Sequence, residues 1–322
     1  MLFRSPTAYG NIHAPLLASA AADSQALECL VRPLPALPRA ALALVWGLFG
    51  LAFGNVYRFR VQQEQTVLPG LKAPIRVLQL SDLHYGTFIG PRMVRRWVEA
   101  ALEQRPDLIV ITGDFLDSSL GLRPQGALFA QLLRLHAPLG VYAVFGNHDW
   151  TSLNTAATRA RFACDLEAIG IRVINNAGLH LRPDLYLAGI DDWWFGSQDI
   201  PAMLEGYAGG ALLLLSHNPD YLPHVPPQVT LTLCGHTHGG QVRVPLLGPI
   251  KRASLYGTQF LEGWVQAVAA QPSAAEHSHP VSQPRVNRGY VTHGLGVTGL
   301  PFRLGVPAEM TVFEFGVEEL SS

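Results

Sequence analysis

The chain has 322 residues, of which 48% are hydrophobic and only 15% charged, and its net charge is −1. This content is ample for a large core, and the length fits one large α/β domain or two smaller ones. The near-neutral balance gives no sign of a basic surface or an acidic tail, so we expect no nucleic-acid partner. Its three cysteines are far apart and odd in number, which argues against a disulfide framework or a thiolate zinc site.

The N-terminal part predicts a leader followed by a membrane segment. Residues 1–38 carry four charges and show no periodicity, so we expect them to be poorly ordered. The uncharged run AALALVWGLFGLAFG (40–54), extended by Asn55–Tyr57, approaches the roughly 20 residues of a spanning helix. Arginines on both sides leave its orientation open. We expect a membrane-anchored protein with a hydrophobic helix within 39–60, and a linker at 62–74; export by a signal peptide and a buried core helix are the alternatives.

From residue 74 onward, short apolar runs alternate with helix-like segments. The runs predict strands at 75–80, 107–112, 141–145, 185–190, 211–215 and 230–234. Helices are predicted at 91–104, 125–136 and 156–170, and closing strands at 290–296 and 309–315. The polar, proline-rich stretch 263–288 predicts a surface excursion in which His277 and His279 are solvated. The alternation predicts an α/β layered fold with a largely buried sheet.

Metal-capable side chains follow five of these runs, each where the predicted strand ends. They are Asp82 and His84, Asp114, Asn147 with His148 and Asp149, His217, and the pair His236 and His238. A histidine after a single strand is more often a loop residue. Because ligand crevices form at the C-terminal edge of open α/β sheets, however, five such motifs in succession predict one shared site.

The residue types in these motifs favour divalent metals. Carboxylate oxygens and imidazole nitrogens together suit Mn²⁺, Fe²⁺, Zn²⁺ or Ni²⁺, of which Mn²⁺ is the choice for assays. One aspartate has two oxygens and can bridge two ions about 3.5–4 Å apart. Two such ions stay positive against two aspartates and a bridging hydroxide, so the centre would attract phosphate and stabilise developing charge.

The order Asp-x-His, Gly-Asp, Gly-Asn-His-Asp, a single His and Gly-His-x-His resembles that of the calcineurin-like metallophosphoesterases. The resemblance covers about residues 74–316, the expected catalytic domain, and implies a four-layer α/β/β/α sandwich. It implies one metal held by Asp82, His84, Asp114 and His238. It implies a second held by Asp114, Asn147, His217 and His236, with Asp114 bridging. His148 would bind no metal, but would face the substrate phosphate and assist the leaving group.

The C-terminal half is similar to a membrane-associated bacterial subgroup, on the motifs GHTHGGQVRVPLLGPI (235–250) and YVTHGLGVTGLPFRL (290–304). That subgroup includes phosphodiesterases and UDP-2,3-diacylglucosamine diphosphatases of lipid A synthesis. The resemblance implies hydrolysis of a phosphoester or pyrophosphate bond in a membrane-associated amphiphilic substrate, by a protein in contact with membrane lipid. A soluble small-molecule phosphodiester substrate is one alternative. A non-catalytic metal-stabilised scaffold is another, and the complete ligand set argues against it.

Several further positions carry narrower expectations. His293 stands where the subgroup pattern has arginine, and a mostly neutral imidazole would hold a substrate phosphate less well. Asp117 and Asp149 are candidate acceptors behind the metal ligands. The aromatic segment DDWWFG (191–196) either lines a lipid or nucleotide cleft or forms the edge of the core. We expect a monomer.

Overall fold

The computed structural model describes residues 54–117, 123–244, 246–270 and 284–318, together with Gly47 and Gly50. The expected leader 1–38, most of the apolar run 40–54, and His277 and His279 lie outside the described residues. The chain divides into two compact units, Met1–Leu48 and Phe49–Ser322, and every element below belongs to the second. Within the described ranges, no helix has the length and apolar character needed to cross a membrane.

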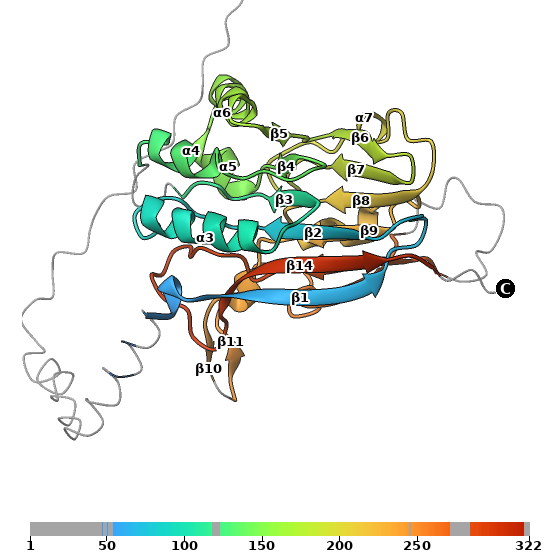
Figure 1. The fold of residues 1–322 in the computed structure, drawn as a ribbon. Helices are drawn as coiled ribbons and strands as arrows, with labels where there is room; N and C mark the ends of the chain where they lie inside the picture. Colours follow the sequence, from blue (N-terminus) through green and yellow to red (C-terminus); the bar gives the residue numbers. More distant parts are fainter. Residues whose placement is uncertain are drawn as a thin grey trace, which may run out of the picture. The chain divides into compact units, whose positions relative to one another are not determined.

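The first sheet of the described residues has six strands in the order β1-β14-β2-β3-β4-β5 (Figure 1). Their bounds are β1 (Phe59–Val67), β14 (Ala308–Gly316), β2 (Ile75–Leu80), β3 (Leu108–Thr112), β4 (Val141–Val144) and β5 (Ile171–Val173). Strands β2 to β5 are mutually parallel. Strand β14 runs antiparallel to β2 and parallel to β1, which occupies the edge.

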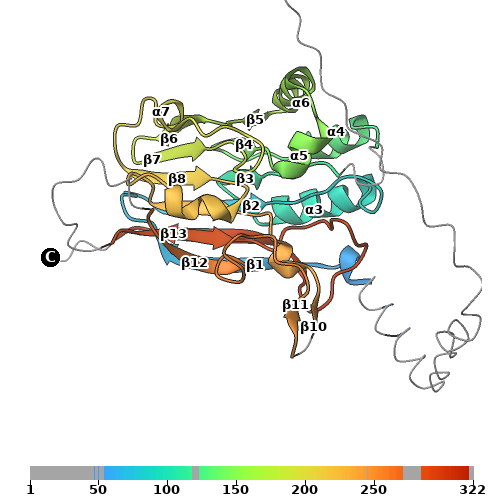
Figure 2. The ribbon, with the colours of Figure 1, turned by 180° about the vertical axis from the view of Figure 1, so that it is seen from behind.

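The second six-stranded sheet has the order β12-β13-β9-β8-β7-β6 (Figure 2). Its strands are β12 (Gly263–Val268), β13 (Val286–Val291), β9 (Leu231–Cys234), β8 (Ala211–Leu215), β7 (Leu185–Gly189) and β6 (Ala177–Arg182). The central β13, β9, β8 and β7 are parallel, while β12 and β6 pair antiparallel at the edges. A short hairpin, β10 (Arg243–Val244) with β11 (Gly248–Pro249), lies outside both sheets.

The two sheets pack face to face across one hydrophobic core. Val77 and Val110 of the first sheet belong to the same buried cluster as Leu187 and Leu213 of the second. All five residues of β3 and of β8 are buried, as expected for strands covered on both faces. Their sequences are therefore continuous apolar runs rather than alternating ones.

Helices cover the outer face of each sheet. Over the first sheet lie α3 (Pro91–Glu103), α4 (Gly126–Leu132), α5 (Asn147–Ser152) and α6 (Ala156–Ala168) (Figure 1). Helix α3 begins with proline at its first turn and buries Met93, Trp97 and Ala101 at helical spacing. The shorter α7 (Ile200–Met203) and the 3₁₀ helix η2 (Pro219–His224) pack on Tyr186 and Leu212 of the second sheet. The predicted α/β class is confirmed.

Several segments differ from the sequence prediction. The first part of the expected linker at 62–74 belongs to edge strand β1, which ends at Val67. Val56, in the 3₁₀ helix η1 (Asn55–Tyr57), is buried in the core rather than extending the apolar run. Gly263–Val268, expected to begin a surface excursion, is strand β12. Both are edge strands, and the exposed face of β1 carries mostly polar residues, so its apolar pattern is weak. Strand β12 exposes Trp264, Gln266 and Val268, so its two faces do not alternate cleanly between apolar and polar. The strand expected at 290–296 lies earlier, because β13 ends at Val291.

Candidate metal centre

The predicted site residues come together at one edge of the two sheets. Asp82 follows β2, Asp114 follows β3, and Asn147 begins α5 just after β4. From the second sheet, His217 follows β8, and His236 follows β9, with His238 in the 3₁₀ helix η3 (His238–Gly240). These strands are parallel within each sheet, so their C-terminal ends deliver side chains to the same edge.

Three of these residues form a first cluster. The Nε2 atoms of His84 and His238 lie 2.9 Å apart. Oδ1 of Asp82 is 3.4 Å from His238 Nε2 and 3.9 Å from His84 Nε2. The main-chain N–H of His236 donates to Oδ1 of Asp82 at 3.0 Å, which fixes the carboxylate. All three side chains are buried.

A second cluster forms around Asn147. Its Oδ1 is 2.7 Å from Nδ1 of His236 and 3.1 Å from Nε2 of His217. The two ring nitrogens are themselves 3.2 Å apart. Three acceptor-bearing groups thus converge on one small, buried volume.

Asp114 lies between the two clusters. Its Oδ2 is 3.5 Å from Nε2 of His84 and 3.3 Å from Nε2 of His217. Its Oδ1 accepts the main-chain N–H of His148 at 2.8 Å, so the carboxylate is held in place from the side of α5. One carboxylate therefore faces both groups of ring nitrogens.

The backbone at this site has an unusual conformation. Five non-glycine residues have positive φ: Asp82 (54°), His84 (45°), Asp114 (54°), His236 (73°) and His238 (53°). Such values are uncommon for residues with a Cβ, and strained backbone concentrates at functional sites.

Glycines permit the close approach of these loops. A Cβ on Gly146 would lie 2.3 Å from Oδ1 of Asp114, and one on Gly235 would lie 2.4 Å from Oδ2 of Asp82. Neither distance leaves room for a side chain. Steric exclusion of a Cβ thus explains why glycine stands at the first position of Gly-Asn-His-Asp and Gly-His-x-His.

Burial and charge set the protonation of the cluster. Burial lowers the pKa of His84 to about 3, and that of His238 well below its ordinary range. Burial opposes the charge on Asp114, but His217, His148 and His84 together bring the pKa of Asp114 well below its usual value. Burial also disfavours a charged His217, yet Asp114 and Asp82 raise the pKa of His217 to about 10. His84 and His238 are thus neutral, while His217 would release a proton on binding a metal.

These donor atoms fit divalent ions. They are Oδ1 of Asp82 and Asn147, Oδ2 of Asp114, Nε2 of His84, His217 and His238, and Nδ1 of His236. Two neutral imidazoles whose nitrogens are 2.9 Å apart share at most one proton, and the neighbouring carboxylate oxygens bring further lone pairs. A cation would satisfy these electron pairs, and mixed N and O ligands match borderline divalent metals.

His148 lies at the rim of this cluster. Its ring packs edge-on against His84 with centroids 4.8 Å apart, and its side chain remains 23% exposed. Nε2 of His148 is 3.2 Å from Oγ1 of Thr298, and Nδ1 is 3.9 Å from Oδ1 of Asp117. The ring is the one predicted site side chain that solvent reaches this readily.

Asp149 supports the surrounding loops. It accepts the main-chain N–H of Gly146 at 3.0 Å and that of Leu116 at 3.1 Å. These bonds join the start of α5 to the loop after β3. The carboxylate therefore holds the segments that carry Asn147 and Asp114.

Arg303 and Thr298 also contact the site, although the sequence pattern did not single them out. Arg303 is fully buried, and its guanidinium donates to the carbonyls of His293, Gly294 and Gly296 and contacts Nδ1 of His238 at 3.2 Å. Its place in the motif YVTHGLGVTGLPFRL is the one feature of the sequence that could have indicated a role for Arg303. Thr298 gave no signal, because a threonine after glycine and valine is an ordinary loop residue.

His293 is engaged by carboxylates. Its Nε2 lies 2.7 Å from Oε2 of Glu262, and its Nδ1 lies 3.2 Å from Oε2 of Glu309. The ring is 7% exposed. His293 therefore binds acidic side chains of its own chain.

The aromatic segment forms part of the core edge, and one of its tryptophans also packs against a candidate ligand. Trp193 packs over the rings of Tyr221 and His224 at the edge of the core. Trp194 is partly exposed and packs edge-on against His236 with centroids 4.4 Å apart, and Phe195 is exposed beside it in the sequence. One side of the site is therefore bordered by an indole.

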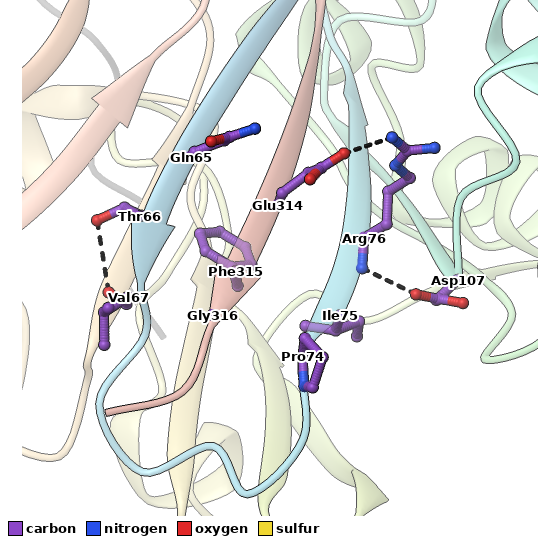
Figure 3. Close-up of a pocket in the computed structure, with 10 residues that line it drawn as sticks. All are labelled: Gln65, Thr66, Val67, Pro74, Ile75, Arg76, Asp107, Glu314, Phe315 and Gly316. Carbon is purple, nitrogen blue, oxygen red and sulfur yellow. Dashed lines mark hydrogen bonds and ion pairs between the residues drawn. The ribbon is translucent and has the colours of Figure 1, made fainter. Parts of the chain in front are cut away.

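A pocket of about 120 Å³ adjoins the other side of the site. Its lining includes His236, His238, Ile250, Lys251, Thr298 and Leu300. A wider hollow of about 640 Å³ lies where β1 and β14 end and β2 begins, at the opposite end of the first sheet (Figure 3). There Arg76 forms an ion pair with Glu314, and its main-chain N–H donates to Asp107 at 2.8 Å. The wider hollow is therefore not the candidate site, because the candidate metal ligands lie at the other end of the strands.

Two sheets between helices, with a buried centre of carboxylates and histidines at one edge, define a metal-binding α/β protein. The family model described as calcineurin-like phosphoesterase matches residues 75–240, and the chain belongs to this family.

Among the relatives, the chain is 31% identical to the uncharacterized metallophosphoesterase YkuE of Bacillus subtilis (strain 168), over 74% of this chain and 78% of the relative. It is 36% identical to phosphodiesterase YaeI of Escherichia coli (strain K12), over 55% of this chain and 65% of that protein. It is 30% identical to a transmembrane protein with metallophosphoesterase domain of Danio rerio, over 76% of this chain and 54% of that protein.

Proposed function

We propose that the chain is a dinuclear metal-dependent hydrolase of phosphoester or pyrophosphate bonds. The first ion would be held by Asp82, His84, Asp114 and His238. The second would be held by Asp114, Asn147, His217 and His236. The observation that carries the proposal is the position of Asp114, whose Oδ2 faces His84 at 3.5 Å and His217 at 3.3 Å, one from each cluster.

In this proposal the side chains have distinct tasks. Two bound divalent ions would supply Lewis acidity and positive charge against the phosphate. Asn147 contributes a neutral oxygen ligand, which leaves the site more positive than a carboxylate would. His148, at the rim and in contact with Thr298, faces the substrate phosphate and protonates the leaving oxygen. Arg303 keeps His238 and the 293–296 loop in position through hydrogen bonds.

We propose an amphiphilic substrate in or beside a membrane, of the UDP-2,3-diacylglucosamine type or another phosphodiester lipid. The apolar run 40–54 and the motif at 235–250, similar to the membrane-associated subgroup, support this substrate class. A membrane anchor would raise the local concentration of a lipid substrate. A soluble phosphodiester and a non-catalytic scaffold remain the alternatives.

We also propose that the catalytic domain begins near residue 55 rather than 74. Val56 lies in the core, and β1 pairs with β14 along its whole length. The membrane segment would then be confined to the residues before Asn55.

The test is a substrate screen with the full-length protein in mild detergent, loaded with Mn²⁺. Aryl phosphomonoesters, aryl phosphodiesters and UDP-2,3-diacylglucosamine would be compared, with metal content measured in parallel. Two ions per chain with preference for the lipid nucleotide or a lipid diester supports the proposal. One ion with full activity contradicts the dinuclear site, and preference for a soluble diester contradicts the amphiphilic substrate.

A further inference from the structure

The hairpin β10–β11 carries exposed leucines beside the candidate metal centre. Leu246 is fully exposed and Leu247 is 80% exposed, and Ile250, directly after β11, is 68% exposed. The hairpin projects away from the two sheets (Figures 1 and 2). We name Leu246, Leu247, Ile250 and the half-exposed Leu300 the apolar rim. Ile250 and Leu300 also line the 120 Å³ pocket next to His236 and His238, so the rim continues into that pocket.

The hairpin is held firmly at its base. Arg243 pairs with Pro249 and Val244 with Gly248, and the main-chain N–H of Arg243 donates to the carbonyl of Leu304 at 2.8 Å. At the tip, Leu246 has φ of +68°. A leucine in this backbone region is rare, and here no burial compensates for it. A fixed base that presents leucines to solvent is typical of a contact surface.

Charge and chain connection indicate what the apolar rim contacts. Lys251 and Arg252 follow Ile250 directly and are both exposed, and Lys251 lines the same pocket. Leucines next to two cations match a phospholipid surface, which offers acyl chains beneath anionic headgroups. The uncharged run 40–54 is followed directly in the chain by Asn55, whose side chain donates to the carbonyl of Arg303, in the loop that carries Leu300.

We infer that the apolar rim inserts into an anionic phospholipid surface, with Lys251 and Arg252 against the headgroups, so that the pocket opens toward lipids. This inference deepens the proposed function by saying how an amphiphilic substrate reaches the metal centre. Its direct test needs no catalysis, so its failure is distinguishable from failure of the proposed hydrolase.

The direct test is fluorescence quenching in the full-length protein. The Leu247→Trp variant is mixed with vesicles of equal parts phosphatidylglycerol and brominated phosphatidylcholine, and the wild-type signal is subtracted. We expect strong quenching of the added indole, and much weaker quenching when phosphatidylglycerol is left out. Leu133→Trp, at a 58% exposed leucine at the end of α4, is the matched control and should be quenched several-fold less.

Quenching equal to that of the control would overturn the inference. Two other occupants of the apolar rim would also overturn it. A second copy of the chain would appear as a dimer that dissociates in Leu246→Asn/Leu247→Ser. If the chain's own run 40–54 covered the apolar rim, the added indole of Leu247→Trp would have a blue-shifted emission, and vesicles would not change it.

A second measurement does not depend on the tryptophan variant. Leu246→Asn/Leu247→Ser keeps a residue tolerant of positive φ at the tip. For this variant and for wild type, the rate on an acylated aryl diester embedded in vesicles is divided by the rate on a soluble aryl diester. We expect this ratio to be lower in the variant by on the order of tenfold. An unchanged ratio would contradict the inference even if both rates are high.

Discussion

At the residue scale, the candidate ligands combine rare backbone conformations with contacts that permit little adjustment. Asp82 and Asp114 have positive φ and are almost completely buried. Each carboxylate is fixed by a main-chain N–H, from His236 and His148 respectively. Residues held this firmly in strained positions are suited to binding ions in a preformed geometry.

Asp114→Asn should remove both metal sites, because one carboxylate serves both clusters. Replacing one oxygen by an amide N–H removes a negative ligand and presents a donor to His84 or His217. Metal analysis after Mn²⁺ loading should give well below two ions per chain, with turnover nearly lost. Asp107→Asn, at the other end of β3, is the control and should keep two ions per chain and normal turnover. Two ions and full turnover in Asp114→Asn would contradict the bridging role.

His148→Gln should keep its metals and lose turnover. A ring nitrogen of His148 lies within 4.8 Å of donor atoms of His84 and Asp114, but the side chain is partly exposed and belongs to neither of the two proposed ligand sets, so we expect both sets to stay intact. A general acid contributes roughly 10²–10⁴-fold to the rate, and most on substrates with basic leaving groups. Rates on aryl and alkyl diesters measure this, with exposed His136→Gln as control. Equal rates on an alkyl diester would refute the role.

The sequence predicts the candidate ligands because their chemistry is distinctive and their position after strands is regular. Of the groups that orient them, it singles out Asp149 but not Arg303. The contacts of His293 with Glu262 and Glu309 join residues far apart in the chain, which no local pattern encodes. Arg303 acts on His238 through a fold that brings residues 65 positions apart together.

At the element scale, the glycines in the loops after β3 and β4 leave no room for a Cβ. Gly146→Ala should disturb this packing, since the added Cβ would lie 2.3 Å from Oδ1 of Asp114 and 2.7 Å from Cε1 of His217. Overpacking of this kind costs about 1–3 kcal/mol. Urea unfolding and Mn²⁺ titration should show lower stability and weaker binding. Gly126→Ala in α4, where nothing lies within 4 Å, should leave Mn²⁺ binding unchanged and stability equal to or slightly above that of wild type. Equal behaviour of the two variants would argue against the steric account.

The turn between β6 and β7 offers a pH-dependent contribution far from the metal centre. Burial would raise the pKa of Asp184, but the N–H of Lys72 and the side chain of Arg182 lower it below the usual 3.8. A lowered folded-state pKa gives stability that is present above pH 3.8 and lost as the pH falls through the folded value. Asp184→Asn should therefore destabilise the protein by on the order of 1 kcal/mol at pH 7.

Urea unfolding at pH 7 and in acid checks this, and the difference from wild type should shrink in acid. Asp165→Asn, in an exposed pair with Arg161, should have little effect at either pH. A difference for Asp184→Asn that stays constant with pH would show that the charge is not the cause.

Buried strands are predictable as elements, and edge strands are not. Strands β3 and β8 are unbroken apolar runs, because both faces are covered. Strand β1, FRVQQEQTV, has only half-buried and exposed residues, so its polar composition is typical of a linker as well. Only its pairing with β14, about 250 residues away, distinguishes the two, and that pairing depends on the complete fold.

At the scale of the whole molecule, the edge strand sets where the catalytic unit begins. Strand β1 covers β14 in register from Phe59 with Ala308 to Val67 with Gly316, and Arg60 pairs with Glu309 at 2.8 Å. Val56 and Leu68 add buried apolar side chains on either side of the strand. A unit that started at residue 74 would expose the whole edge of β14, and open strand edges promote aggregation.

Truncation tests this boundary. The fragment 55–322 should be soluble, bind Mn²⁺ and hydrolyse a small aryl diester at the full-length rate, since every described strand and helix of the two layered sheets is retained. The fragment 74–322 should aggregate or unfold at a markedly lower temperature, although it contains all the candidate ligands. Thermal unfolding and light scattering distinguish the two, and 50–322 serves as the control for shortening alone. A stable, active 74–322 fragment would mean that β1 is dispensable, and would return the boundary of the catalytic domain to the one expected from sequence.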